Sequence, residues 1–365
     1  MKVRTTKEKI LEAALVVERI TGKKESLPIL SCILIEAGKE ISLRATNLEA
    51  GVNIRIPGTI EEKGIVAVPA AVLTQTLRSI GADAVSLRTE GGNLYLESRG
   101  TKTLIKAIPH EEFPSLGSEE RKGGNNIPRT ALLNGLQSVL YAASHSMIRP
   151  ELGSVYVSIK QTGLVCVATD SFRLAEKTVP CTGMPDGGEI LIPLKHAAEL
   201  SYILERIPDE KITLRADDAQ LSIFGAEIRF VSRVVEGTFP NYQEIIPKEF
   251  TAQATTLKND FAEMLRKARS FSGNDQHVGL HVYPKRKMFT ATAQNPDVGE
   301  MSDALDAALE GDDIDINFHI GYLAECLPSI SADSIILGFS GADKPLVIRG
   351  VSDASFTYLV MPLNR

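Results

Sequence analysis

Few residues in this chain have the types and spacing that a chemical reaction requires. His277 and His281 lie four residues apart, but Gly279 separates them at the expected start of a strand, so they do not share a helix face. The chain contains neither a Gly-x-Ser-x-Gly sequence nor a Cys-x-x-Cys pair. We therefore expect no catalytic residues, no metal site and no cofactor, and we do not expect an enzyme.

Asp170 could act as a general acid, but a structural role explains it better. It ends a predicted strand in Ala168-Thr169-Asp170, and two other predicted strands end similarly, at Thr46-Asn47 and at Gln294-Asn295. An Asx side chain in such a turn accepts hydrogen bonds from the backbone just beyond it. Because the feature recurs, we interpret Asp170 as a turn residue. The next four residues, Ser171-Phe172-Arg173-Leu174, have no counterpart elsewhere and are candidates for function.

These turns belong to a sequence that is repeated three times. Segments that open a helix begin at Val68, Ile192 and Phe318, at a period of about 124 residues that is too long for a solenoid. Each is followed by two short strand patterns in the same register. The repeats indicate one domain triplicated, with boundaries at 1–122, 126–248 and 250–365. Gly117–Asn125 has linker composition, and Pro247–Thr256 is a second, weaker linker.

Each repeat contains two amphipathic helix patterns and several alternating strand patterns. Phe261, Met264, Leu265 and Ala268 form one apolar face, while the rest of that helix is mainly basic. A similar spacing of Leu133, Leu136, Leu140 and Ala143 predicts another helix. Antiparallel strands that alternate in this way pack one face on the helices. We expect an α+β fold of three repeated domains, each with two helices packed on antiparallel sheet.

Composition and charge narrow the class of protein further. The net charge of −6 argues at first against a nucleic-acid partner, but eight acids and no Lys or Arg lie between Asp297 and Asp315. The remainder of the chain is positive, and binding a polyanion needs only one positive face. No apolar run follows Lys2 and Arg4, and no stretch approaches the ~20 apolar residues of a membrane span. We expect a cytoplasmic protein, not a membrane protein, with four reduced, buried cysteines.

Several strings of residues carry a resemblance that covers the whole chain. They are Leu27-Pro28-Ile29-Leu30, Ala168–Ala175, Thr238–Tyr242 and the terminal Val360–Leu363. With the triplication, they resemble the family of bacterial DNA polymerase III beta subunits, the sliding clamps. The Ala-Thr-Asp-x-x-Arg-Leu-Ala and Phe-Pro-x-Tyr strings are fairly specific at this spacing, whereas Leu-Pro-Ile-Leu alone is weak.

The resemblance implies a DNA clamp fold in which each chain forms half of a closed ring. Two chains would join head to tail, as a homodimer around double-stranded DNA, and act as a processivity factor in DNA replication. A head-to-tail interface closes only if its rotation divides a full turn, and sequence alone does not decide between two chains and another number. The implied partners are the replicative DNA polymerase alpha subunit, the clamp loader, repair polymerases and mismatch-repair proteins.

The resemblance also implies three sets of site residues. A pocket for short partner peptides would comprise Leu152, Thr169, Ser171, Phe172, Arg173, Leu174, Pro240, Ile245, Tyr322, Val360, Met361, Pro362 and Leu363. The candidates for DNA contact are Lys23, Lys24, Arg78, Arg149, Lys195, Arg266 and Lys267. The dimer interface would pair Thr103 and Ile105 with Phe271. Solvated surface charge remains the alternative for each cation, and local core packing remains the alternative for Phe271.

The type of DNA contact can be inferred from features that the basic residues lack. Trp is absent, and Tyr and Phe do not interleave with the cations, so neither stacking on single strands nor base readout is supported. We therefore expect phosphate contact that is independent of DNA sequence. A rival interpretation is a peptide-binding scaffold of triplicated domains that does not bind DNA.

Three residues depart from the pattern of the family and leave the preferred peptide open. Phe172 stands where His is common, Glu244 where some members have Arg, and His277 where a Phe can border the pocket. At the end of the chain, the closing strand of the third repeat reaches about Val360. We expect the fold to have no use for Leu363–Arg365.

A local conflict concerns Ser302–Glu310. Helix propensity is high in this segment, although the repeat places a strand there. We expect a strand, because the same position in the repeat is extended.

Overall fold

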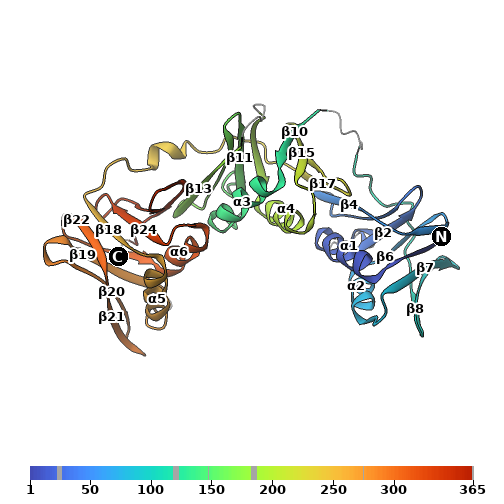
Figure 1. Cartoon of the computed structure of the whole chain (residues 1–365), viewed down its shortest axis with the longest axis horizontal. Helices are drawn as coiled ribbons and strands as arrows, with labels where there is room; N and C mark the ends of the chain where they lie inside the picture. Colours follow the sequence, from blue (N-terminus) through green and yellow to red (C-terminus); the bar gives the residue numbers. More distant parts are fainter. Residues whose placement is uncertain (23–26, 118–122, 147, 182–186, 274, 364–365) are drawn as a thin grey trace. The chain divides into compact units, whose positions relative to one another are not determined.

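The computed structural model describes residues 1–22, 27–117, 123–146, 148–181, 187–273 and 275–363 (Figure 1). The chain forms two compact units. The first comprises Met1–Thr130 with Lys195–Val234, and the second comprises Ala131–Leu194 with Val235–Arg365. Six α-helices occur in the described ranges, two in each sequence repeat as expected.

An eight-stranded antiparallel sheet is the larger sheet of the first unit. Its strand order is β10-β15-β16-β17-β4-β3-β2-β6, and Phe230 of β17 pairs with Val52 of β4. Along β3 the buried side chains alternate, as Ile41, Leu43 and Ala45 show. The strand bounds are β2 (Cys32–Ala37), β3 (Ile41–Thr46), β4 (Ala50–Ile56), β6 (Gly64–Pro69), β10 (Asn125–Pro128), β15 (Lys211–Ala216), β16 (Gln220–Phe224) and β17 (Ile228–Arg233).

A second sheet and three helices complete the first unit. The sheet has the order β5-β1-β7-β8-β9, with β1 (Lys2–Thr6), β5 (Thr59–Glu62), β7 (Ala84–Glu90), β8 (Asn93–Ser98) and β9 (Thr101–Ile105). The helices are α1 (Lys7–Ile20), α2 (Ala70–Ser79) and α4 (Leu194–Arg206). The hydroxyl of Thr6 caps α1 by accepting from the backbone N–H of Lys9.

A nine-stranded antiparallel sheet is the larger sheet of the second unit. Its order is β14-β11-β12-β13-β26-β25-β24-β18-β22, and Ala175 of β13 pairs with Tyr358 of β26. The bounds are β11 (Ser154–Lys160), β12 (Gly163–Thr169), β13 (Arg173–Pro180), β14 (Gly188–Pro193), β18 (Ala252–Leu257), β22 (Ala307–Gly311), β24 (Ser334–Phe339), β25 (Leu346–Gly350) and β26 (Asp353–Val360).

The second unit also has a four-stranded sheet and three helices. The sheet order is β21-β20-β19-β23, with β19 (His277–Tyr283), β20 (Met288–Asn295), β21 (Gly299–Leu305) and β23 (Ile314–His319). The helices are α3 (Arg129–Val139), α5 (Lys258–Arg269) and α6 (Ile320–Glu325). Two short 3-10 turns, η2 (Leu140–Ala142) and η3 (Tyr242–Ile245), contribute to the site described below.

The two units do not coincide with the three repeats because two sheets cross repeat boundaries. Strand β4 of the first repeat pairs with β17 of the second, and β13 of the second repeat pairs with β26 of the third. The second repeat therefore contributes four strands to each large sheet. Backbone pairing of this kind joins each outer repeat to the adjoining half of the second repeat as one compact body.

The helix faces confirm most of the amphipathic patterns. Phe261, Met264, Leu265 and Ala268 are all buried in α5, as predicted. The prediction for α3 was partly wrong, because Leu132 is buried instead of Leu133. A Cβ on Gly135 would lie 2.5 Å from Cys166 Sγ, so α3 approaches its sheet through this glycine, which shifts the buried face by one residue.

The expectation of a strand across residues 302–310 is confirmed. Residues 299–305 form β21 and residues 307–311 form β22, and each strand pairs along its length with a neighbour. Tertiary pairing therefore overrides the helix propensity of this segment.

All four cysteines are buried and free, and burial raises the pKa of the Cys166 thiol to about 12. Within the described ranges, no three His, Cys, Asp or Glu side chains are placed to hold a metal ion. None of the helices in this part of the chain has the length and apolarity that crossing a membrane requires.

Candidate functional site

The turn from Thr169 to Arg173, which links β12 to β13, forms one wall of the candidate site. Asp170 Oδ1 accepts from the backbone N–H groups of Phe172 and Arg173, at 2.9 and 3.0 Å. Thr169 Oγ1 donates to the carbonyl of Arg173 at 2.6 Å, and Ser171 takes a positive φ of 79°. The interpretation of Asp170 as an Asx-turn residue is confirmed, and the turn leaves Phe172 at its outer end.

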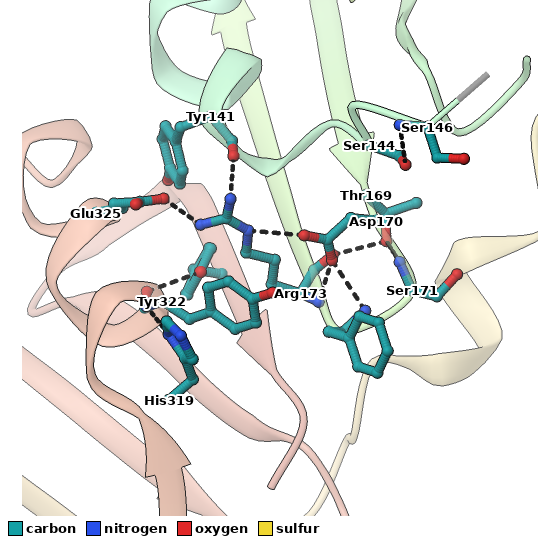
Figure 2. A network of polar contacts seen from close by, with 12 residues as sticks. Tyr141, Ser144, Ser146, Thr169, Asp170, Ser171, Arg173, His319, Tyr322 and Glu325 are labelled. Atoms are coloured by element: carbon teal, nitrogen blue, oxygen red, sulfur yellow. Dashed lines mark hydrogen bonds and ion pairs between the residues drawn. The ribbon is translucent and has the colours of Figure 1, made fainter. Parts of the chain in front are cut away.

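Arg173 fixes this turn to two other elements of the second unit (Figure 2). Its Nε donates to Asp170 Oδ2 at 3.0 Å, one terminal nitrogen pairs with Glu325 of α6, and the other donates to the carbonyl of Tyr141 in η2 at 2.5 Å. Only 8% of the side chain is exposed. Burial disfavours the charge, but the hydrogen bond to Glu325 and the nearby acids outweigh it and raise the pKa of Arg173.

Aromatic rings surround the guanidinium and complete its environment. The guanidinium carbon of Arg173 lies 4.3 Å from the ring centre of Tyr322, and the ring of His319 lies 4.3 Å from the same tyrosine. His319 Nδ1 accepts from the backbone N–H of Tyr322, which caps α6. Burial and the charge of Arg173 lower the pKa of His319, in keeping with a neutral ring that accepts this bond.

A groove of about 690 Å³ opens beside this turn, and we call it the Phe172 groove. Its lining comes from three segments of the second unit: residues 169–174, residues 244–249 and the strands β24 to β26 with their connections. Three large apolar side chains on it are well exposed, with 61% of Phe172, 56% of Ile245 and 38% of Met361 accessible. Leu174 and Leu359 contribute buried apolar surface beneath them.

Charged side chains border this apolar surface. Glu244, Lys248, Glu249 and Lys344 also line the groove. Glu244 accepts a hydrogen bond from the side-chain amide of Asn241 at 2.6 Å. The groove therefore suits an apolar chain segment with polar ends, and its lining residues include no nucleophile paired with a base.

The structure brings together about half of the pocket residues predicted from the sequence. Those that line the groove are Thr169, Ser171, Phe172, Arg173, Leu174, Ile245 and Met361, whereas Leu152, Pro240, Tyr322, Val360, Pro362 and Leu363 do not. Leu152 and Val360 are buried in the fold, and the ring of Tyr322 contacts the guanidinium of Arg173 and not the groove. His277, considered as a border of the pocket, lies instead beside a separate polar hollow on β19.

The sequence prediction missed one side of the groove. Pro247, Lys248, Glu249, Ser340, Lys344 and Pro345 line it and were not predicted. The hydroxyl of Ser340 donates to the carbonyl of Glu249 at 3.0 Å, which joins two segments about 90 residues apart. The composition of Gly341–Pro345 indicates only a loop, so no local signal points to this wall.

The end of the chain is held more firmly than its sequence indicates. The backbone N–H of Met361 donates to the carbonyl of Phe172 at 2.7 Å, and that of Leu363 donates to the carbonyl of Asn317 at 2.8 Å. The expectation that the fold has no use for Leu363 was wrong, because Leu363 resumes backbone pairing beyond Pro362, which cannot donate. Residues 364–365 lie outside the described part of the chain.

Five of the seven basic candidates are described, and they lie on exposed helix positions or in a loop. Arg78 and Lys195 are exposed on α2 and α4 of the first unit, and Arg266 and Lys267 are exposed on α5 of the second. Lys267 pairs with Asp303 at 2.8 Å, and Arg149 pairs with Glu151 at 2.9 Å. Lys23 and Lys24 lie outside the described residues.

The interface candidates differ in exposure. Thr103 lies half-buried on β9, which ends its sheet, but Ile105 is only 3% exposed within its own unit. The neighbouring Leu104 has the exposed apolar side chain. Ile105 was therefore the wrong choice for an exposed contact, because the alternation of β9 turns it inward. Phe271 is half-buried beside the start of β21, where a Cβ on Gly299 would lie 3.9 Å from its ring.

Comparison with known proteins places this geometry in a family. Models of the N-terminal, central and C-terminal domains of the DNA polymerase III beta subunit match residues 1–117, 126–241 and 243–364. The beta sliding clamp of Synechococcus elongatus is 26% identical over 356 residues, covering 95% of both chains. The beta sliding clamp of Proteus mirabilis is 24% identical over 367 residues, covering 100% of both.

Solved structures agree on the fold. The DNA polymerase III beta subunit of Thermotoga maritima superposes with a TM-score of 0.93 at 24% identity, over 100% of this chain and 99% of that one. The DNA polymerase sliding clamp of Bacillus subtilis gives a TM-score of 0.92, with the same identity and coverage. With three consecutive domain models matched across nearly its whole length, the chain belongs to the family of DNA polymerase III beta subunits, the beta sliding clamps.

Proposed function

We propose that this chain closes with a second copy into a ring around double-stranded DNA and tethers the replicative polymerase to it. As a beta sliding clamp, the chain is a non-catalytic DNA replication protein that confers processivity. The three consecutive clamp domains are the observation that carries this proposal. A chain of this kind acts where the chromosome is, which in a bacterium is the cytoplasm.

Ring closure would use the strand edges at which the sheets of one chain end. Strand β9 ends its sheet and presents Leu104 with Lys102, while β21 ends another and carries Glu300 and Asp303. An unpaired edge is a template for pairing with another chain. We propose that β9 of one copy, around Thr103 and Leu104, meets β21 and Phe271 of the other, head to tail.

DNA contact would come from five exposed cations, three of which are not engaged in ion pairs. Arg78, Lys195 and Arg266 form no ion pair with another described residue, whereas Arg149 and Lys267 are paired with acids. Salt bridges between exposed groups are weak and exchange readily. We expect all five to meet phosphates in a salt-dependent, sequence-independent way.

The Phe172 groove would hold short peptide segments of the polymerase alpha subunit, the clamp loader, repair polymerases and mismatch-repair proteins. Burying two or three apolar peptide side chains contributes ~1.5 to 3 kcal/mol each. Ordering the peptide offsets part of this gain, which leaves an affinity on the order of micromolar. Weak binding of this kind suits partners that take turns on one ring.

A retention assay on DNA tests the ring. After loading, the protein should stay on nicked circular duplex through a high-salt wash and should leave linear duplex of the same sequence. Arg266→Glu with Lys267→Glu should weaken salt-sensitive contact and leave peptide binding unchanged, because both side chains lie away from the groove lining. Equal retention on circle and line would contradict the proposal.

A further inference from the structure

The three repeats place different residues at one equivalent position in their sheets. Strands β2, β11 and β19 each pair with the strand that enters the second helix of their repeat, and the position is the third residue of each. It holds Leu34 in the first repeat, Tyr156 in the second and Gly279 in the third. A glycine in the interior of a strand weakens it and often marks the close approach of another group. The third repeat is therefore the exception.

Segments from elsewhere in the chain cover this position in the first two repeats. Leu34 belongs to a buried cluster against which Ile108 and Phe113 pack. The ring of Tyr156 stacks on that of Phe239, with 5.1 Å between the ring centres. Each covering segment follows the last strand of its repeat, β9 in the first and β17 in the second. This face of the sheet is therefore a place where an extended segment can lie.

The third repeat has a polar hollow of about 420 Å³ at this position, and we call it the Gly279 hollow. Its lining residues all come from β19, β20, β21 and β23, so no other described segment of the chain lines it. A Cβ on Gly279 would lie 2.8 Å from Thr292 Oγ1 and 3.1 Å from both Asn317 Oδ1 and His281 Nε2. Three polar atoms therefore converge at the point where the other repeats have a large side chain.

Hydrogen-bond acceptors dominate the Gly279 hollow. His281 Nδ1 lies 2.5 Å from Asp315 Oδ1, and His281 Nε2 lies 2.8 Å from Thr292 Oγ1. Because the carboxylate requires a donor at Nδ1, Nε2 accepts from the Thr292 hydroxyl, whose lone pairs stay available to a ligand. The side chains of Asn317 and Glu300 line the hollow and have no partner among the described residues. No Lys or Arg lines it, so a cationic ligand with several donors fits best.

The charge around the Gly279 hollow favours the same kind of ligand. Eight acids and no Lys or Arg lie between Asp297 and Asp315. An arginine guanidinium carries five donors in a planar fork that matches carboxylate and amide oxygens. We propose that an extended segment of another protein lies on this face of the third repeat and that an arginine of that segment enters the Gly279 hollow.

The proposed ring leaves this face accessible. A second copy that pairs with the edge of β21 extends the sheet sideways and does not cover its faces. Gly279 and Thr292 belong to β19 and β20, which are the inner strands of the sheet. Arginine binding here therefore depends neither on DNA nor on the Phe172 groove.

Binding of matched peptides to the full chain tests this inference. Fluorescent peptides of sequence Gly-Ser-Arg-Ser-Gly are compared, by anisotropy at low ionic strength, with peptides that carry citrulline in place of arginine. Citrulline has a similar shape without the charge, and the unaltered chain should favour arginine by at least about fivefold. In Gly279→Ala this preference should fall below about twofold, because the added methyl displaces the three converging atoms without changing any charge. Asn317→Asp should strengthen arginine binding about threefold.

The matched control is Gly225→Ala in the first unit, where a Cβ would lie 2.9 Å from Ile228 Cγ2 and 3.0 Å from Asp209 Oδ2. It should leave both peptide affinities unchanged. Circular dichroism checks that the variants fold, and Thr292→Val replaces Gly279→Ala if that variant does not.

Two results would overturn the inference. Equal binding of the two peptides to the unaltered chain would exclude an arginine site, and a preference that persists in Gly279→Ala would assign it to general attraction by the acidic segment. Lys102→Ala and deletion of residues 364–365 should each leave the preference unchanged. A preference that emerges only in one of them would make this chain itself the occupant and would overturn binding of another protein.

Discussion

The turns at Thr46–Ala50 and Thr169–Arg173 share one backbone design but present different surfaces. In both, an Asx side chain accepts from two backbone N–H groups and a Thr hydroxyl donates to the fifth residue's carbonyl. The residue after the Asx has a positive φ in both, 76° at Leu48 and 79° at Ser171. The turn is therefore a property of the fold and not of the function.

A glutamate on the helix near each turn is paired with an arginine, but the arginine comes from a different element in each unit. In the first unit, Arg19 of α1 pairs with Glu199 of α4 at 2.5 Å, and the turn ends in buried Ala50. In the second unit, Glu325 of α6 pairs with Arg173, so the turn itself supplies the cation. The helix glutamate is therefore paired in both units, but only in the second unit does the turn supply the arginine. We call Arg173, with its bonds to Asp170, Glu325 and Tyr141, the anchor of the second turn.

The two turns also differ in the side chains that they present at the surface. The first turn presents Glu49 beside Arg233, whereas the second presents Phe172 beside Met361. A charged turn stays solvated, but an anchored apolar turn leaves surface that a ligand can cover. The binding site proposed for the second turn therefore differs from the first turn in a few side chains, while the backbone is the same.

The largest expected effect is on the anchor itself. Arg173→Ala removes a mostly buried cation that serves Asp170, Glu325 and Tyr141, and should lower the free energy of unfolding by about 3 kcal/mol. Arg19→Ala, at a pair in which the arginine is 44% exposed, should cost about 1 kcal/mol. Urea unfolding of both variants measures the difference. Equal costs would show that the two pairs are interchangeable and the anchor unimportant.

Removing the end of the chain should affect binding next most strongly. Deletion of Met361–Arg365 removes a groove residue and two backbone hydrogen bonds, each contributing about 0.5 to 1.5 kcal/mol. Peptide affinity should fall at least about tenfold, with a modest decrease in melting temperature. Deletion of residues 364–365 alone is the control and should change neither. Unchanged affinity after the longer deletion would place the peptide elsewhere.

Exchanging the two Asx residues isolates charge from turn geometry. Asp170→Asn keeps the acceptor for the turn but weakens the bond from Arg173, and should cost about 1 kcal/mol. Asn47→Asp keeps the acceptor where no arginine follows, and should change stability by less than about 0.5 kcal/mol. Thermal unfolding reports both. A large cost at Asn47 would mean that the first turn depends on charge as well.

The smallest expected effect is a dependence of the free energy of unfolding on pH that comes from a histidine of the first unit. His196 occupies the position in the first unit that Tyr322 has in the second, and burial lowers the pKa of His196 below its usual 6.5. The unfolded chain then takes up the proton first, so stability is full above about pH 6.5 and falls as the pH drops below it. Urea unfolding at pH 7.5 and 5.5 measures this.

The variant His196→Gln should reduce the pH dependence of unfolding. His319, whose pKa is also lowered, should leave a residual dependence. An identical loss of stability in the variant and the unaltered chain would assign the whole effect to His319 and the carboxylates.

Much of the fold could be predicted from local patterns. The face of α5 and the strand at residues 302–310 were predicted from periodicity and from the repeat. The face of α3 was shifted by one residue, because the close approach of Gly135 to Cys166 is a tertiary contact with no sequence signal. The inward turn of Ile105 was missed because the register of β9 depends on its neighbour.

The sequence alone determined the triplication, the α+β class, the Asx turns and the unusual residues after Asp170, because these depend on local spacing and on comparison among copies. Only the tertiary structure decided that Arg173 reaches Glu325 and Tyr141, and that residues 244–249 and 340–345 complete the groove. Those residues are far apart along the chain; the pairing of β13 with β26 and the hydrogen bond from Ser340 to Glu249 bring their segments together. Long-range backbone pairing leaves no local pattern from which such neighbours could be read.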